Sequence, residues 1–380
     1  MFVRLFIIMP FAACALLTLC FILPACRELR LGRCARAACA SVVLLACSKF
    51  FFYWLLGGNA FNPELPLAVI WTWNWLYSSM FLLFGLYITT AFLPRRFRLS
   101  PAAKLTVLPA VAAVLAAWGV WNGIRIPSVR EIEVECPSLP KHLDGYRIVH
   151  ITDIHASSAA PRWRTEAIVK AANATDADLA VCTGDIVDGS PELHGRDVEP
   201  IRELKAKDGV WFSTGNHEFY GDWIGWQKLY DEWGIRFLRG ECVFPRDGLA
   251  LGGVDDKSAD RFNVSMNAMD VSRAFATATN GEFRVLLQHR PKEFGENAEF
   301  HGIGLQLSGH THGGVMPLMR SLVALFNGGH VRGIYSASGK SGAKLFVSPG
   351  CGQWAGFPIR LFDDSEITVI VLRRPKTENR

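Results

Sequence analysis

The sequence predicts a mixed α/β protein whose first third is embedded in a membrane. Long apolar runs fill residues 1–122, and β-rich segments follow in the remainder. Five of those segments are followed closely by an aspartate, asparagine or histidine. A chain of 380 residues is long for one ordinary domain, so we expect two units, residues 1–122 and residues 123–380.

Four apolar runs in the first region are each long enough to cross a bilayer, which takes roughly 20 residues of helix. These runs are residues 2–23, 38–56, 67–93 and 105–121. A cleaved signal peptide would account for the first run alone, and a surface helix of a soluble protein would alternate with polar residues. We therefore expect four transmembrane helices.

The loops between these runs predict the orientation. The first and third loops carry the basic residues Arg27, Arg30, Arg33, Arg36, Arg95, Arg96 and Arg98. The second loop, residues 57–66, contains no lysine or arginine. Because short basic loops stay in the cytoplasm, both termini are expected outside it. In a bacterial cell, the C-terminal unit would then lie on the periplasmic or extracytoplasmic side of the inner membrane.

Charge and cysteine content exclude other classes of protein. Residues 1–122 hold ten basic residues and two acidic ones, so the remainder of the chain carries a charge of about −3 out of the total of +5. That remainder lacks the basic surplus of a nucleic-acid-binding protein, and we expect no nucleic-acid partner. The ten cysteines show no Cys-x-x-Cys spacing, which argues against a zinc ribbon and assigns no disulfide.

The β-rich segments of the second unit place metal-binding residue types at their ends. The segments are residues 146–152, 178–183, 209–213, 283–288 and 304–307, and the residues that follow are Asp153, Asp185, Asn216, His289 and His310. A further strand is expected over residues 129–136 and a helix over residues 162–174. Open α/β folds place their chemistry at the carboxyl ends of strands, so the repetition indicates a single site.

His155, His217 and His312 complete a set of two aspartates, one asparagine and five histidines. Carboxylate, amide oxygen and imidazole suit Mn, Fe or Zn, and the lack of cysteine argues against a structural zinc. Two divalent ions about 3.5–4 Å apart can hold phosphoryl oxygens and generate a hydroxide near neutral pH. The set therefore predicts a two-metal hydrolytic site.

The ordered motifs Asp-Ile-His, Gly-Asp-Ile-Val-Asp, Gly-Asn-His-Glu, a single histidine and Gly-His-Thr-His resemble those of the calcineurin-like metallophosphoesterase superfamily. The resemblance covers about residues 129–372. Residues 139–154 and 346–361 are similar to the membrane-attached bacterial branch, some members of which remove phosphate-linked groups from lipid intermediates. The resemblance implies a four-layer α/β/β/α sandwich.

The resemblance also implies a role for each motif position. The metal ligands would be Asp153, His155 and His312 for one ion, Asn216, His289 and His310 for the other, and Asp185 as the bridge. His217 would protonate the leaving oxygen or stabilise the transition state, and Asp188 would accept a hydrogen bond from His217 and orient it. The chain departs from related protein phosphatases at Gly189, where they carry a phosphate-clamping arginine, so protein-phosphatase activity is not expected.

Several residues have more ordinary interpretations. The histidines expected to pack or to face solvent are His142, His150, His194, His301 and His330. Glu218 is expected to be a polar turn residue. Lys49, within the second apolar run, is either paired or snorkelling, or else functional. Residues 316–326 form either part of the core or a hydrophobic rim beside the metals, to which Trp354 and Phe357 would add.

We therefore expect a metal-dependent phosphoester hydrolase that acts by direct attack of a metal-bound hydroxide. The substrate expected is a lipid or cell-envelope phosphoester reached at the membrane surface, either a monoester or a diester. One alternative is a tethered nucleotide phosphodiesterase, and another is a membrane receptor that binds metal without turnover. The presence of His217 and Asp188 favours catalysis, because neither is needed for binding alone.

Overall fold

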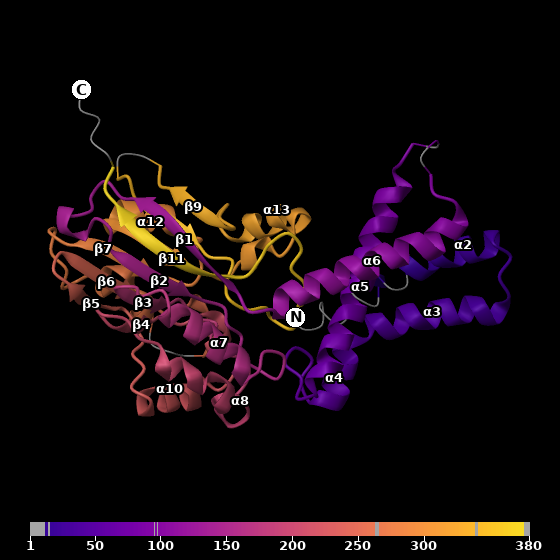
Figure 1. The fold of residues 1–380 in the computed structure, drawn as a ribbon, viewed down its shortest axis with the longest axis horizontal. Coiled ribbons are helices and arrows are strands. Elements are labelled where there is room, and N and C mark those ends of the chain that lie inside the picture. The colour runs from indigo at the N-terminus through magenta and orange to yellow at the C-terminus, as the bar shows by residue number, and fades with distance from the viewer. Residues whose placement is uncertain are drawn as a thin grey trace. The chain divides into compact units, whose positions relative to one another are not determined.

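The computed structural model describes residues 12–13, 16–94, 96, 98–262, 266–338 and 341–375. It comprises two compact units, between which the chain passes three times (Figure 1). The helical unit combines residues 1–123 with Trp354–Leu361. The α/β unit combines Ile124–Gln353 with Phe362–Arg380.

Apolar helices make up the helical unit. In the described part of the chain, two helices are long and apolar enough to span a membrane, α5 (Leu67–Ala91) and α6 (Pro101–Ile124). The pair α3 (Arg33–Cys47) and α4 (Lys49–Gly57) passes the same test together, but it is bent by 59°. The short helix α2 (Leu23–Glu28) follows a π-helical turn, Thr18–Ile22.

The described residues thus bear out two of the four expected spans as single helices. The run expected over residues 38–56 is a broken helix, and the run over residues 2–23 lies largely outside the described residues. The break falls at Ser48, whose hydroxyl donates to the Leu45 carbonyl at 2.6 Å. A serine that bonds back to its own helix weakens the backbone ladder there and bends the helix.

Lys49, which follows the break, is fully buried. Its Nζ donates to the carbonyl oxygen of Ala355 at 2.5 Å and lies 5.0–5.2 Å from the ring centroids of Phe50, Tyr53 and Tyr77. The ammonium group therefore does not snorkel to the surface. It is held by a backbone oxygen and by the negative faces of aromatic rings.

The segment Trp354–Leu361 is part of the helical unit although it is distant in sequence from the helices. The rings of Trp354 and Phe357 pack against other aromatic rings of this unit, with centroids 5.6 and 5.4 Å apart. A Cβ at Gly119 would lie 2.4 Å from a side-chain carbon of Ile359, so helix and segment meet where a glycine makes room. Trp354 and Phe357 thus pack within the helical unit.

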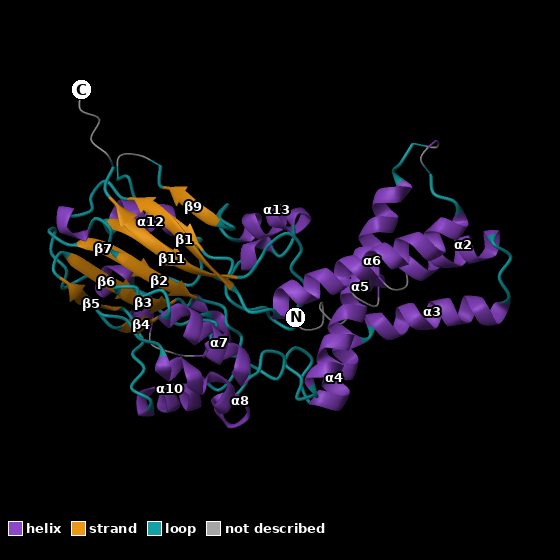
Figure 2. Cartoon of the chain, viewed as in Figure 1, coloured by secondary structure: helices purple, strands orange, loops and turns teal. Residues whose placement is uncertain are grey.

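Two β-sheets form the centre of the α/β unit (Figure 2). The first sheet has the order β1 (Ser128–Glu135), β11 (Glu366–Arg373), β2 (Arg147–Ile151), β3 (Leu179–Cys182) and β4 (Val210–Phe212). The second has the order β5 (Glu241–Arg246), β6 (Leu249–Gly253), β7 (Phe283–Leu287), β8 (Ile303–Ser308), β10 (Lys344–Val347) and β9 (Gly333–Ser336). Strands β2, β3 and β4 are parallel to one another, as are β6, β7, β8 and β10.

Neighbouring residues along each strand face opposite sides of the sheet, and this alternation separates the layers of the α/β unit. On β2, Ile148 belongs to the core between the two sheets, whereas its neighbour Val149 belongs to the core beneath the outer helices. The helices that cover the first sheet are α7 (Arg162–Asn173), α8 (Pro191–Val198) and α10 (Trp223–Glu232), and those on the outer face of the second are α11 (Val271–Ala274) and α12 (Phe294–Phe300). The central strands of both sheets are therefore buried on both faces, and the expected mixed α/β fold with two sheets is confirmed.

The remaining elements are short. They are the helices α9 (Asn216–Tyr220) and α13 (Pro317–Phe326) and the 3₁₀ turns Lys141–Leu143, Glu199–Glu203, Lys257–Phe262, Met266–Met269 and His312–Gly314. The six strands and the helix expected for this unit are present as β1, β2, β3, β4, β7, β8 and α7. All nine cysteines in the described part of the chain are free thiols.

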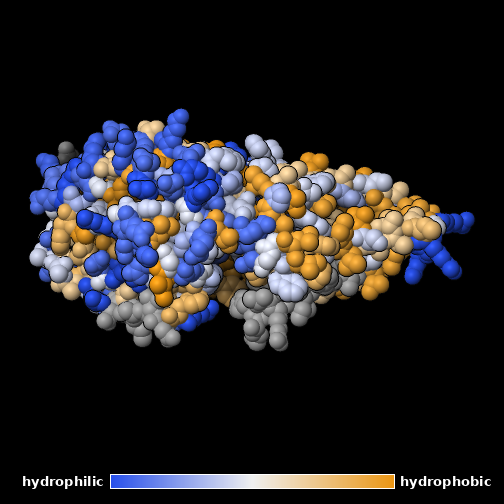
Figure 3. All heavy atoms as spheres, turned by 90° about the horizontal axis from the view of Figure 1, so that it is seen from below, coloured by the Kyte–Doolittle hydropathy of each residue, from blue (hydrophilic) through white to orange (hydrophobic). Residues whose placement is uncertain are grey.

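Hydropathy differs sharply between the two units. On the face that Figure 3 shows, many hydrophobic side chains lie on the helical unit and mainly hydrophilic ones on the α/β unit. Large apolar side chains such as Trp54, Val114 and Trp118 are more than half exposed on the helices. An apolar exterior of this kind is stable against lipid and unfavourable in water, so the chain is associated with a membrane.

Candidate metal centre

Loops that follow five parallel strands lie together at one edge of the α/β unit. The loops follow β2, β3, β4, β7 and β8, and the first candidate metal ligands that they carry are Asp153, Asp185, Asn216, His289 and His310. The backbone joins neighbouring loops directly. Asp153 N donates to Gly184 O at 3.0 Å, and Gly309 N donates to His289 O at 2.9 Å.

The backbone of these loops is strained. Nine non-glycine residues in the described part of the chain have a positive φ, and five of them are candidate metal ligands. These five are Asp153, His155, Asp185, His310 and His312, with φ between 47° and 71°. A left-handed conformation costs of order 1–3 kcal/mol for a residue with a Cβ and persists where the surrounding structure enforces it. The strained backbone therefore directs the candidate ligand side chains toward a common point, at a cost in stability.

Glycine permits the closest approach between the loops. Gly184 has a φ of +91°, and a Cβ there would lie 2.0 Å from the backbone nitrogen of Gly215. The loops that carry Asp185 and Asn216 thus touch backbone to backbone. Any larger residue at Gly184 would push the two candidate ligands apart.

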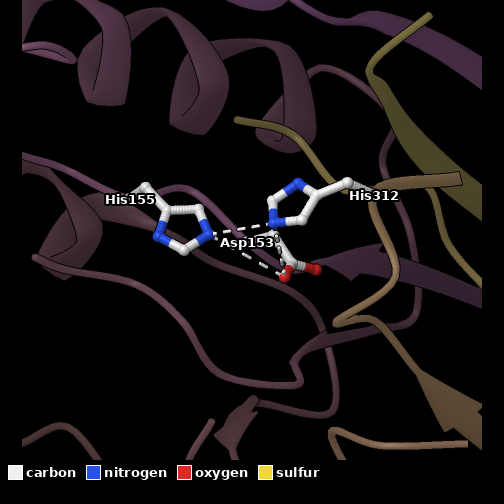
Figure 4. Close-up of side chains that lie close together, drawn as sticks. All are labelled: Asp153, His155 and His312. Carbon is white, nitrogen blue, oxygen red and sulfur yellow. Dashed lines mark hydrogen bonds and ion pairs between the residues drawn. The ribbon is translucent and has the colours of Figure 1, made fainter. Parts of the chain in front are cut away.

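The first cluster of candidate ligands comprises Asp153, His155 and His312 (Figure 4). The Nε2 atoms of His155 and His312 lie 3.3 Å apart, and they lie 4.0 and 3.7 Å from Oδ1 of Asp153. Two imidazole nitrogens and a carboxylate oxygen that face one another at these distances are arranged as ligands of one cation.

The second cluster comprises Asp185, His289 and His310. Nε2 of His289 lies 3.2 Å from Oδ2 of Asp185 and 3.3 Å from Nδ1 of His310. The same Oδ2 lies 3.8 Å from Nε2 of His155 in the first cluster. Asp185 therefore lies between the two clusters, where a bridging carboxylate is expected.

Asn216 begins helix α9 and is buried. Its Oδ1 is also buried and has no hydrogen-bond partner among the described residues. A buried amide oxygen without a partner is costly unless it binds a ligand. This oxygen, together with the two clusters of carboxylate and imidazole, fits a pair of hard or borderline divalent cations.

Asp188 holds two histidines of the site at once. Its Oδ1 makes a short contact with Nδ1 of His217 and lies 3.2 Å from Nδ1 of His155. The expected pairing with His217 is present, and the second contact with a candidate metal ligand was not expected. A carboxylate that fixes Nδ1 of an imidazole orients its Nε2 toward the centre.

Electrostatics favour cations at this site. Burial alone would lower the pKa of His217, but the carboxylates of Asp185 and Asp188 raise it to about 9. Burial likewise opposes the charge on His289, whose pKa the Asp185 carboxylate raises to about 10. Burial would raise the pKa of Asp185, but its imidazole neighbours hold it well below the usual range. The Asp185 carboxylate therefore retains its negative charge, and cation binding at neutral pH must displace protons from the imidazoles beside it.

Glu218 is more than the polar turn residue that the sequence predicts. It is fully buried, and its carboxylate accepts hydrogen bonds from the backbone nitrogens of Asp185, Ile186 and Gly215 at 2.9, 2.7 and 2.6 Å. The side chain thus fastens the loop after β3 to the loop after β4. Its position three residues after Gly215 is the capping-box spacing, a signal that predicts the Gly215 contact but not the other two.

The histidines expected to be ordinary lie outside both clusters. His150 is fully buried, packs edge-on against Phe346 and hydrogen-bonds to Thr183 Oγ1 at 2.9 Å. His194 pairs with Asp197. The others, which contact polar backbone or side-chain atoms or aromatic rings, are His142, His301 and His330.

Comparison with known proteins agrees with this geometry. Residues 146–314 match the family model described as calcineurin-like phosphoesterase. The chain is 33% identical over 284 residues to a "Transmembrane protein with metallophosphoesterase domain" of Danio rerio. It is 30% identical over 291 residues to the protein of the same description from Bos taurus. Each alignment covers 72% of this chain and 64% of the relative, so the chain spans less than two thirds of their length. An "Uncharacterized metallophosphoesterase" of Helicobacter pylori is 31% identical over 256 residues, which cover 67% of this chain and 66% of that protein.

The contacts of Glu218 predict the effect of replacing it with glutamine. In Glu218→Gln, one carboxylate oxygen becomes an NH₂ group that faces backbone N–H donors. We expect the free energy of unfolding to fall by about 1–3 kcal/mol and Mn²⁺ to bind more weakly, because the Asp185 loop loosens. Thermal unfolding and calorimetric Mn²⁺ titration of the full chain measure both effects. The exposed Glu232→Gln is the matched control, and identical behaviour of the two variants would contradict the assignment.

Proposed function

This chain belongs to the calcineurin-like metallophosphoesterase superfamily, and from that premise we propose that it hydrolyses phosphoesters at a dinuclear metal centre. The observation that carries the proposal is the position of the Asp185 carboxylate between two clusters. Within each cluster the potential ligand atoms all lie within 4.8 Å of one another. A single-metal site or a structural zinc site would need one such cluster and no bridging carboxylate.

We assign the ligands by their clusters. The residues proposed are Asp153, His155 and His312 for one ion, Asn216, His289 and His310 for the other, and Asp185 for both. Carboxylate, amide and imidazole donors suit Mn, Fe or Zn. When bound, two such ions supply the positive charge that holds phosphoryl oxygens and the acidity that makes a hydroxide nucleophile near neutral pH. Attack would be direct, without a covalent enzyme intermediate.

His217 and Asp188 are the proposed catalytic pair. Asp188 engages Nδ1 of His217, so the proton for the leaving oxygen would come from Nε2. The carboxylates of Asp185 and Asp188 raise the pKa of His217 against the effect of burial, which favours a protonated imidazole that is able to donate. A receptor that binds metal without turnover has no need of a buried carboxylate that holds a histidine in its charged form. This pair therefore favours an enzyme over that alternative.

We propose a lipid or cell-envelope phosphoester as the substrate class. Two features support this choice. The chain is associated with a membrane, and helix α13 begins five residues after His312 without burying any of its apolar side chains. A tethered phosphodiesterase for soluble nucleotides is the alternative, and it gives no role to this apolar surface.

The orientation proposed is the one that the loop charges predict, with the α/β unit outside the cytoplasm of a bacterial cell and several helices in the inner membrane. Four basic residues lie in the stretch 27–36, and none lie in residues 57–66. Short basic loops resist translocation, which supports this arrangement.

Replacement of the bridging carboxylate and of the catalytic histidine tests the enzymatic proposal. We expect Asp185→Ala and His217→Ala each to lower kcat by about 10²–10⁴-fold on chromogenic phosphomonoesters and phosphodiesters with Mn²⁺. The full chain in detergent is the sample to use, because Trp354–Leu361 belongs to the helical unit. The exposed pair Asp247→Ala and His142→Ala provides matched controls. Undiminished turnover in Asp185→Ala or His217→Ala would refute the assigned roles.

The substrate class is tested by comparing one phosphoester headgroup with and without acyl chains. For the full chain in mixed micelles, we expect kcat/KM to be at least about tenfold higher for the acylated compound, because binding of the chain adds favourable apolar contact. A soluble nucleotide diester serves as the third substrate. Equal efficiency on all three would favour the tethered nucleotide phosphodiesterase.

Reporter fusions test the orientation. A reporter that is active only outside the cytoplasm should be active when fused at the C-terminus or within residues 57–66, and silent within residues 27–36. Activity in the last fusion, with a silent C-terminal fusion, would mean that the topology is inverted.

A further inference from the structure

Helix α13 presents an apolar surface that no other described part of the chain covers. None of its ten residues is buried. Leu318, Leu322, Leu325 and Phe326 expose 89, 48, 75 and 68% of their surface. A surface helix in water normally carries charged residues on its outer face, yet Arg320 is the only charged residue of α13.

The single charged residue fastens the opposite face of the helix. Nε and Nη2 of Arg320 donate to Oδ2 of Asp363 at 3.1 and 2.9 Å, and Nη1 of Arg332 donates to Oδ1 at 2.7 Å. Asp363 is fully buried. Two arginines on one buried carboxylate make a strong, charge-assisted anchor. The polar side of α13 is therefore fixed to the α/β unit.

Helix geometry then sets the direction of the apolar side chains. Successive residues of an α-helix are rotated by about 100°. Leu318, Leu322 and Leu325 accordingly project within about 40° of the direction opposite Arg320. The helix is amphipathic, with an arginine anchor on one side and a continuous leucine surface on the other.

The connectivity of the anchor points to the membrane as the partner of this surface. Asp363 follows Leu361 by two residues, and Leu361 ends the segment that packs within the helical unit. Phe362, between them, is 71% exposed. The residue that holds α13 is thus joined by two peptide bonds to a segment packed among membrane helices.

The chemistry of the surface favours a fluid apolar phase over a protein partner. Leu318, Leu322, Leu325 and Phe326 have no side-chain donor or acceptor, so nothing on this face fixes the register of a partner. Specific protein interfaces carry several hydrogen bonds across them. Short amphipathic helices with such a face lie in the boundary between headgroups and acyl chains.

We propose that α13 lies in the bilayer interface, with Leu318, Leu322 and Leu325 among the acyl chains. The helix begins five residues after His312, so its insertion would hold the candidate metal centre at the lipid surface. This consequence for substrate access rests on the proposed function, whereas the insertion of the helix does not.

Photocrosslinking in vesicles tests the insertion. Incorporate p-benzoylphenylalanine in place of Phe326 in the full chain, reconstitute it in phosphatidylcholine vesicles, irradiate, and identify adducts by mass spectrometry. Phe300 is the matched control, because it is the last residue of α12 and is 70% exposed, against 68% for Phe326. We expect at least about tenfold more phosphatidylcholine adduct at position 326 than at position 300.

A second labelled position guards against a local effect of the probe. The same photoreactive residue in place of Leu322 should also yield a lipid adduct, and circular dichroism shows whether each labelled chain is folded. Equal lipid yields at positions 326 and 300, or adducts from positions 322 and 326 to another part of the chain, would overturn the proposal. Because this measurement needs no turnover, it separates failure of the insertion from failure of the proposed function.

Discussion

The site depends on the carboxylate of Asp185. Its Oδ2 lies 3.2 Å from Nε2 of His289 and 3.8 Å from Nε2 of His155, and its Oδ1 accepts the backbone N–H of His217 at 2.8 Å. A buried carboxylate is stable only with compensating positive charge. Protons on the imidazoles provide that charge in the absence of cations, and bound cations would provide it more fully. The surrounding loops serve to hold this one group in place.

The sandwich supplies the rigidity that such loops require. Strands buried on both faces leave little freedom at their ends, so the backbone can hold five candidate ligands at positive φ. Glu218 then joins two of the loops through three backbone hydrogen bonds. Packing in the sheets maintains the strain in the loops. A less rigid framework would allow the strained residues to relax, and the candidate ligands would then move apart.

The chain that precedes the segment Trp354–Leu361 packs against the candidate site within the α/β unit. A Cβ at Gly350 would lie 2.8 Å from Cβ of Asp153, and Cys351 N donates to Thr152 O at 2.8 Å. The buried Arg164 donates to the Cys351 carbonyl at 2.6 Å. Three residues after Cys351, the chain enters the segment that accepts the Lys49 hydrogen bond.

The sequence by itself determined the strands that lead into the site and the identity of the candidate ligands, because alternating apolar segments and the residues after them are local patterns. It determined two of the membrane helices for the same reason. Tertiary structure decided the rest. Only packing brings Glu218 against Asp185, shares Asp188 between His217 and His155, places Phe357 against Phe81 of α5 and leaves α13 uncovered. These contacts join residues that are distant in sequence. No local periodicity or motif predicts which loop a buried carboxylate will contact or which apolar helix will stay uncovered.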